Sequence, residues 1–205
     1  KKDDPVILRG CFKIPTIQAE LPKACADWAY LSKEEFKAKC LKRESGYISG
    51  IGGVGKSYTM LEITEELEQE GVVVKKLAKC HVAALNIKGQ TADSFLHKYQ
   101  NGGCSSSKHC IILEEVCTLD TRLLAALAKR KRMGVQFICL GCPNQHLPIN
   151  NAANGVPVEP DYEASAFLKT LCDGNRLHLT ESKRSGDGPL WDYYSSIAIG
   201  GYRFH

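Results

Sequence analysis

The residues with the clearest chemical potential are Gly50 to Ser57, which read Gly-Ile-Gly-Gly-Val-Gly-Lys-Ser. They match the pattern Gly-x-x-x-x-Gly-Lys-Ser/Thr at every fixed position. In such a loop the glycines let backbone N–H groups point into one concavity, the lysine reaches the terminal phosphates, and the hydroxyl holds Mg²⁺. The loop therefore predicts a bound nucleoside triphosphate with Mg²⁺. The predicted contacts are Gly50, Gly52, Gly53, Val54, Gly55, Lys56 and Ser57.

The segments on either side of this loop are those that a phosphate-binding loop requires, a short strand before it and a helix after it. Tyr47–Ser49 is a short β-prone run. The helix that follows carries Met60, Ile63 and Leu67 on one face before Gly71 ends it. A glycine-rich loop that matched the pattern by chance would need neither element, so the flanks favour the phosphate-binding interpretation.

A second group able to do chemistry is the pair of carboxylates that ends an apolar run at Cys110–Glu115. A nucleotide hydrolase needs an acidic side chain to hold the metal ion and a group to activate water. We therefore expect Glu114 to bind Mg²⁺ together with Ser57, and Glu115 to act as the base. Without the upstream loop, two surface acids after a core strand would explain the same pattern.

The order of these and three further segments resembles the RecD-like and PIF-type branch of superfamily 1 DNA helicases. The segments resemble the family's phosphate-binding, single-strand-contacting, metal-binding, third and fourth motifs, and they are residues 48–57, 83–95, 112–120, 134–148 and 179–185. By this resemblance, Gln145 is the residue that senses the γ-phosphate and Arg184 is the arginine finger.

The resemblance also implies a fold and an activity. The expected fold is α/β, a three-layer RecA-like P-loop NTPase domain with a mostly parallel sheet. The expected activity is ATP hydrolysis, with Mg²⁺, coupled to binding of single-stranded DNA and translocation along it. The expected catalytic residues are Lys56, Glu115, Gln145 and Arg184, which would stabilise the transferring phosphoryl group and orient the attacking water.

Five residues are candidates for contact with single-stranded DNA, which such proteins hold through hydroxyls, backbone N–H groups and aromatic platforms. They are Cys80, His81, Thr91, Ser94 and Phe95. Phe95 has a second interpretation, because Tyr99 follows it at helical spacing, and that pattern is typical of core packing.

The chain departs from the family pattern at four of these positions. Glu114 and Cys142 stand where the family has aspartates, and Cys80 and His81 replace a DNA-contacting threonine and a frequent glycine. The first two departures affect the metal, and a thiol is a poor hydrogen-bond donor. The alternative to a motor is therefore an ATP- and DNA-binding module with weak or lost hydrolysis. A small-molecule kinase fits less well, because it has no use for the third and fourth motifs.

Apolar β-rich runs alternate with helical runs after residue 45, which predicts a parallel sheet covered on both faces. The expected strands are Gly46–Ser49, Val72–Leu77, Cys110–Leu113, Val135–Leu140 and Arg176–Leu179. The expected helices are Lys56–Glu70, Thr91–Tyr99, Thr121–Lys131, Tyr162–Cys172 and Pro189–Ile199. A long loop is expected at Pro143–Pro160.

Residues 1–45 are expected to form a lead-in segment, and residues 46–205 the RecA-like domain. The lead-in has one predicted helix, which begins at a capping box made by Ser32 and Glu35. We expect it to cover the core, with packing against a partner chain or a missing second RecA-like domain as the alternative. Because the sequence stops at His205, before the family's fifth and sixth motifs, we expect a truncated first motor domain that does not unwind DNA alone.

The composition fits one globular domain, since 43% of the 205 residues are hydrophobic and 24% are charged. The formal net charge of +4 is too small to establish nucleic-acid binding. The one compact basic run, residues 129–132, falls at the end of a predicted helix. Cations suit that end of a helix, so a solvated cap is favoured over a phosphate or localisation patch.

The ten cysteines are interpreted as thiols, because a P-loop enzyme works in a reducing compartment and no signal peptide opens the chain. The expected location is therefore intracellular. Cys139 and Cys142 have C-x-x-C spacing, but no second pair completes a zinc site, so burial as small hydrophobes is favoured. No membrane span is expected, because prolines interrupt the longest uncharged stretch, residues 133–158.

Overall fold

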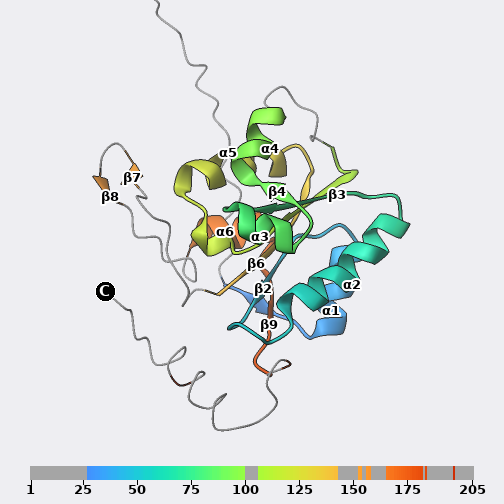
Figure 1. The fold of residues 1–205 in the computed structure, drawn as a ribbon. Coiled ribbons are helices and arrows are strands. Elements are labelled where there is room, and N and C mark those ends of the chain that lie inside the picture. The colour runs from blue at the N-terminus through green and yellow to red at the C-terminus, as the bar shows by residue number, and fades with distance from the viewer. Residues whose placement is uncertain are drawn as a thin grey trace, which may run out of the picture.

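The computed structural model describes residues 27–99, 106–142, 152–153, 156–157, 165–181, 183 and 196. Within these residues a seven-stranded sheet, parallel throughout, runs through the centre in the order β1-β9-β2-β6-β5-β3-β4 (Figure 1). Its strands are β1 (Ala29–Tyr30), β2 (Gly46–Ser49), β3 (Val73–Ala78), β4 (Gln90–Thr91), β5 (His109–Leu113), β6 (Gln136–Gly141) and β9 (Asn175–His178).

Helices cover both faces of this sheet in the described part of the chain (Figure 1). The first three pack on one face and the last three on the other. They are α1 (Lys33–Leu41), α2 (Lys56–Gln69), α3 (His81–Asn86), α4 (Ala92–Lys98), α5 (Thr121–Lys131) and α6 (Ala166–Leu171). This three-layer arrangement confirms the predicted fold class.

The central strands are apolar on both sides because each face of the sheet meets a helical layer. In β5, Ile111 and Leu113 pack toward α4, α5 and α6, whereas Cys110 and Ile112 pack toward α1, α2 and α3. All four side chains are fully buried. The uninterrupted apolar run in this strand is therefore a consequence of its central position.

The described part of the predicted lead-in belongs to the same layered fold. Ser32 caps α1, and its capping box with Glu35 is complete, as predicted. Phe36 is fully buried beneath the sheet, and a Cβ on Gly46 would lie 2.4 Å from its ring. Residues 29 and 30 add the edge strand β1 beside β9. Residues 1–26 lie outside the described residues.

The predicted elements agree with the structure in most of the chain. Strand β2 and helix α5 begin and end where predicted, and the other predicted strands shift by one residue. The sequence did not predict β1, α3, β4, the 3₁₀ turn η1 (Val116–Thr118), or β7 (Ala152–Ala153) and β8 (Val156–Pro157), which form a separate antiparallel pair inside the predicted long loop. The predicted helix at 189–199 falls outside the described residues, apart from Ser196.

None of the helices in the described ranges combines the length and the apolar character that a bilayer crossing requires.

Candidate nucleotide and DNA site

The predicted nucleotide-binding residues meet at one edge of the sheet. Strands β2, β6 and β5 are neighbours and parallel, so their carboxyl ends lie side by side. The phosphate-binding loop follows β2, and the two glutamates follow β5. As a result Ser57 and Glu114 come into contact, with the Ser57 hydroxyl 3.5 Å from Glu114 Oε1.

The backbone of the loop explains why glycine is needed there. Gly50, Gly53 and Gly55 have φ angles of 149°, 90° and 89°, a region that residues with a Cβ rarely adopt. Gly50 has a further constraint, because a Cβ on it would lie 2.4 Å from the carbonyl oxygen of Leu179. The segment after β9 therefore packs directly against the start of the loop.

Two backbone hydrogen bonds hold that segment in place. Leu179 donates its N–H to the Ser49 carbonyl at 2.8 Å, and Lys183 donates its N–H to the Gly53 carbonyl at 2.9 Å. The sequence did not predict that Lys183 would hold this segment against the phosphate-binding loop. Its neighbour Arg184, the predicted arginine finger, lies outside the described residues, and so does Gln145.

The Lys56 side chain folds back onto the backbone of the loop that contains it. Its Nζ donates hydrogen bonds to the carbonyl oxygens of Gly50 at 2.6 Å and Ile51 at 2.8 Å. Burial lowers the pKa of Lys56, while Cys142 and the carboxylates of Glu114 and Glu115 act in the opposite direction. The ammonium group is thus held at the loop, close to the acidic end of β5.

Glu114 has the properties expected of a ligand for a divalent cation. Burial, followed by the nearby Glu115, raises the pKa of its carboxyl group. Its Oε2 is shielded from solvent and has no hydrogen-bond partner among the described residues. An unpartnered carboxylate oxygen beside the Ser57 hydroxyl fits Mg²⁺, which takes oxygen ligands.

A site of this kind needs few protein ligands. Within the described ranges, no three or more His, Cys, Asp or Glu side chains gather into a metal-binding group. Mg²⁺ commonly takes one or two protein ligands and completes its shell with phosphate oxygens and water. The pair Ser57 and Glu114 therefore suits Mg²⁺ bound together with a nucleotide.

Glu115 stands in an unusual backbone conformation. Its φ and ψ are 50° and 48°, the left-handed region, which costs a residue with a Cβ about 1 kcal/mol or more. The turn is held by Thr118, whose N–H and hydroxyl both donate to the Glu115 carbonyl at 2.8 Å. Strained residues of this kind cluster at functional sites. Its role as the base remains a prediction.

The two cysteines of the C-x-x-C spacing have different surroundings. Cys139 belongs to the core cluster beneath α5 and α6, whereas Cys142 follows β6 at the edge where Lys56 lies. Both are buried, and all seven cysteines in the described residues are free. Six of the seven are buried and Cys80 is exposed, which agrees with the prediction that most of the cysteines are buried thiols.

Four of the five predicted DNA-contacting residues lie at the continuation of the same edge, beyond β5. Strands β3 and β4 pair at Ala78 and Thr91. Cys80, which follows β3, caps α3 by accepting the Ala83 N–H at 3.4 Å. Thr91 caps α4 by accepting the Ser94 N–H at 3.2 Å. Cys80, Ser94 and the first α3 residue, His81, are exposed, whereas Thr91 is nearly buried.

The prediction that Phe95 contacts DNA is wrong. Its side chain is fully buried, with its ring centroid 4.9 Å from that of Tyr99 and 5.1 Å from the Arg130 guanidinium. A base cannot stack on a ring that solvent does not reach. The alternative interpretation, core packing at helical spacing with Tyr99, is the one that the structure confirms.

The sequence did not predict an ion pair between Lys79, which follows β3, and Asp120, which precedes α5. Lys79 Nζ lies 2.9 Å from Asp120 Oδ2, and Asp120 Oδ1 accepts the Leu123 N–H at 2.9 Å, capping α5. Burial opposes ionisation of Asp120, but the hydrogen bonds from Lys79 and Leu123 outweigh it and hold its pKa below the ordinary value. An aspartate directly before a predicted helix is a recognisable cap signal.

Comparison with known proteins gives a family and a fold. A family model described as an AAA domain matches residues 37–156. No protein of curated function matches the sequence.

Several solved helicase structures share the fold. Pif1 helicase from Candida albicans has a TM-score of 0.64 and 22% identity over 83% of this chain and 44% of its own. A structure of two coordinating Pif1 helicases at forked duplex DNA has a TM-score of 0.60 and 17% identity, over 83% of this chain and 48% of its own. Bacteroides Pif1 bound to single-stranded DNA has a TM-score of 0.55 and 19% identity, over 84% of this chain and 47% of its own. These matches confirm, for the fold, the likeness that the order of motifs predicts. The chain spans less than half of each of these proteins.

Proposed function

The chain belongs to the AAA domain family, and on that premise we propose that it is the ATP-hydrolysing motor domain of a DNA helicase, in which turnover is coupled to single-stranded DNA. The observation that carries the proposal is the shared sheet edge. Phosphate-loop and acidic residues end β2 and β5, and the candidate DNA-contacting residues end β3 and β4, the next strands along. A nucleotide and a DNA strand bound at this edge would be neighbours.

The proposed chemistry assigns each residue one task. Backbone N–H groups of the loop and Lys56 bind the phosphates, and Ser57 and Glu114 hold Mg²⁺. When bound, Mg²⁺ neutralises charge on the phosphate oxygens. Glu115 accepts a proton from the attacking water. By the family resemblance, Gln145 orients that water and Arg184 stabilises charge on the transferring group.

Short connections between neighbouring strands offer a route for the coupling. Glu114 donates its backbone N–H to the Leu77 carbonyl of β3 at 2.8 Å, two residues before Lys79. Lys79 in turn pairs with Asp120, which follows the acidic turn and begins α5. A shift of Glu114 on hydrolysis would therefore reach Cys80 and His81 through its hydrogen bond to Leu77 and the short stretch of backbone that follows Leu77. DNA stimulation of ATP turnover by the proposed motor is the measurement that tests this coupling.

The solved structures support the nucleic-acid half of the proposal. One of the Pif1 structures is bound to single-stranded DNA, and another concerns unwinding at forked duplex DNA. This chain covers 44–48% of those proteins, so we place strand separation in a longer assembly that includes a second RecA-like domain or a partner chain. ATP turnover and single-strand binding are the activities proposed for this chain.

The second candidate function is a module that binds ATP and DNA and hydrolyses weakly. Two features favour it, Glu114 in place of a shorter acid and the buried thiol of Cys142 at the same edge. A longer carboxylate changes the distance to the ion, and a neutral thiol supplies no charge to it.

Measurement of ATP turnover with and without a single-stranded oligodeoxynucleotide separates the two candidates. DNA-stimulated turnover that Lys56→Ala abolishes, and that the exposed control Lys42→Ala retains, would support the motor. Tight ATP binding without turnover would support the module. Glu114→Asp with Cys142→Asp should then raise the rate, and no gain would refute the metal assignment. A chain that binds no nucleotide would refute both candidates.

A further inference from the structure

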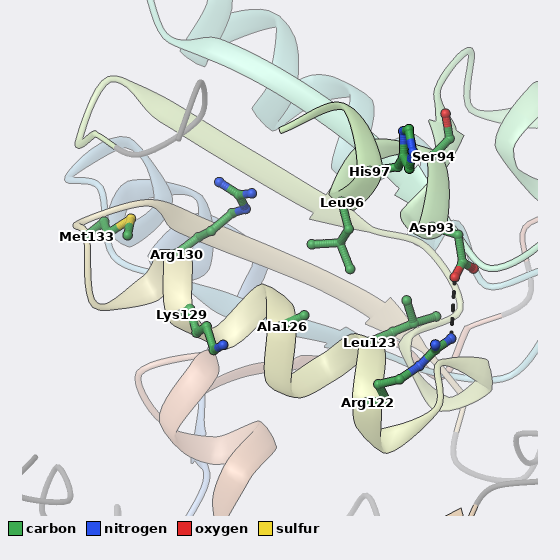
Figure 2. A pocket seen from close by; sticks show the side chains of 10 residues that line it. All are labelled: Asp93, Ser94, Leu96, His97, Arg122, Leu123, Ala126, Lys129, Arg130 and Met133. Carbon is green, nitrogen blue, oxygen red and sulfur yellow. Dashed lines mark ion pairs between the residues drawn. The ribbon is translucent and has the colours of Figure 1, made fainter. Parts of the chain in front are cut away.

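A groove runs between α4 and α5 (Figure 2), and one of the residues that line it is Ser94, the candidate DNA contact in the first turn of α4. We call it the α4–α5 groove. It encloses about 800 Å³. Its lining residues include Asp93, Leu96, His97, Arg122, Ala126 and Lys129.

The bottom of the α4–α5 groove is aliphatic. Figure 2 shows Leu96 of α4 pointing into the space between the helices, opposite Leu123 and Ala126 of α5. At the far end Met133, in the turn after α5, is 52% exposed. Methionine is adaptable and is often used at surfaces that accept varied apolar side chains. These residues offer contacts to an apolar side chain from outside.

The rim of the groove is positively charged. It carries Arg122 and Lys129 against one acid, Asp93, and His97 also lines it. Arg122 and Lys79 each lie 3.7 Å from Asp93 and so offset its charge. Neither His97 nor Lys129 has an ion-pair partner among the described residues. The rim is therefore complementary to an acidic ligand.

The basic run that the sequence analysis assigned to a solvated helix cap divides into two parts. Arg130 is 7% exposed and donates to the Tyr99 carbonyl at 2.6 Å. Lys131 lies 2.7 Å from Asp173 and donates to Ser45 at 2.6 Å. These two residues are structural, so the solvated-cap interpretation is wrong for them. The other two, Lys129 and Arg132, are exposed, and Lys129 lines the groove.

We propose that the α4–α5 groove docks an acidic, amphipathic segment of a partner protein, with apolar anchors on its floor and carboxylates at Arg122 and Lys129. A cleft between two helices suits an amphipathic helix, whose anchors recur at every third or fourth residue. A single-stranded nucleic acid fits less well, because base-stacking sites are built from aromatic rings and the groove offers aliphatic side chains.

The chain's own termini are poor candidates for this occupant. Residues 1–26 contain five Lys or Arg and three Asp or Glu, and residues 184–205 contain two of each kind. Neither has an acidic excess. The one acidic internal stretch outside the described residues carries Glu159, Asp161 and Glu163. This stretch is the competing occupant of the α4–α5 groove, and the experiment below distinguishes it from a partner protein.

Selection from a displayed library of random 12-residue peptides on the full chain tests the proposal. Enriched peptides should carry Asp or Glu around apolar residues at helical spacing. Fluorescence anisotropy with a labelled selected peptide should then show binding that weakens about five-fold or more in Lys129→Glu, because a rim charge is reversed. Ala126→Arg should abolish it by filling the floor. Lys42→Glu, a matched reversal elsewhere on the surface, should not change it.

Circular dichroism and nucleotide binding should be unchanged in all three variants, which separates loss of docking from loss of the fold. Enrichment without an acidic preference, or equal binding by Ala126→Arg, would overturn the proposal. Displacement of the peptide by an oligodeoxynucleotide that itself requires Lys129 would show a nucleic-acid site instead. Enrichment only after Glu159→Gln, Asp161→Asn and Glu163→Gln would show that the chain's own acidic stretch occupies the groove.

Discussion

Replacement of Glu114 by glutamine should have opposite effects on the protein without and with its proposed ligand. Without ligand, the carboxylate is partly desolvated beside Glu115, and its Oε2 has no hydrogen-bond partner among the residues that the structure describes. Removal of an unsatisfied buried charge raises the free energy of unfolding by about 1 kcal/mol. For a chain of 205 residues this raises the melting temperature by about 2–4 °C. We therefore expect Glu114→Gln to stabilise the ligand-free protein.

The pH dependence of this gain follows from the direction of the pKa shift. A carboxyl group whose pKa is raised in the folded protein opposes folding where it is ionised, above that pKa. As the pH falls through it, the group takes up a proton and the penalty disappears. The advantage of Glu114→Gln should therefore be largest above the folded pKa, and should shrink as the pH is lowered through it toward the ordinary value of 4.5.

With Mg²⁺ and ADP the order should reverse. A ligand at 100 times its dissociation constant stabilises the native state by about 2.7 kcal/mol. At about 2–4 °C per kcal/mol, this raises the melting temperature of the wild-type chain by about 5–11 °C. The part of this shift that is lost when EDTA replaces Mg²⁺ should be absent in Glu114→Gln, because the amide binds the cation poorly.

Thermal unfolding with ADP and either Mg²⁺ or EDTA measures both effects. Glu115→Gln is the matched control, since it should keep the Mg²⁺-dependent shift while it loses turnover. A Glu114→Gln variant that melts lower without ligand and keeps the full Mg²⁺-dependent shift would refute the reasoning. Glu114 would then be a surface acid that stabilises the end of β5.

Three further predictions concern the parts around the nucleotide site. Phe95→Leu should lower the free energy of unfolding by about 1–2 kcal/mol in urea titrations and leave DNA affinity unchanged in the folded protein, since the ring is in the core; selective loss of DNA binding at full stability would contradict this. Asp120→Asn should keep the helix cap but lose about 1 kcal/mol of charge-assisted hydrogen bonding. Because the folded pKa lies below the ordinary 3.8, this loss should be complete above pH 3.8 and vanish as the pH falls through the folded value; unfolding at pH 3, 4, 5 and 7 checks the sign. Gly50→Ala should abolish nucleotide binding, because its Cβ would meet the Leu179 carbonyl. Gly71→Ala, with φ +80° and no described atom within 4 Å of the added Cβ, should cost about 1 kcal/mol of stability and retain binding, and equal binding by both variants would count against the close packing at Gly50.

Much of the fold could be predicted because it depends on consecutive residues. Helix α5 was predicted to the residue, since its apolar positions recur at helical spacing before a basic end. The pattern was weaker in the short elements. Helix α3 has six residues and β4 has two, too few for a period to show. Both depend on their neighbours, since β4 pairs with the end of β3 and α3 packs its alanines under the sheet.

The candidate site was predicted only in part for the same reason. The phosphate-binding loop is contiguous, so its pattern is complete in the sequence. The aromatic residue assigned to DNA, Phe95, was misplaced because a motif gives residue types and not the side of a helix that faces the core. The pair of Lys79 and Asp120 joins residues 41 positions apart, and no local pattern marks it.

The sequence by itself predicted the ligand class and determined the layered fold, because glycines with positive φ, apolar periods and caps act within a few residues of chain. Tertiary structure decided which of these parts meet. Strand order brings Ser57 to Glu114 across 57 positions and places Leu179 against the start of the phosphate loop. It also leaves Glu114 Oε2 without a hydrogen-bond partner within the described part of the chain. It also buries Phe95 and leaves a charged groove open between α4 and α5. Burial and long-range contact are properties of the packed sheet, and for that reason neither could be read from the order of residues.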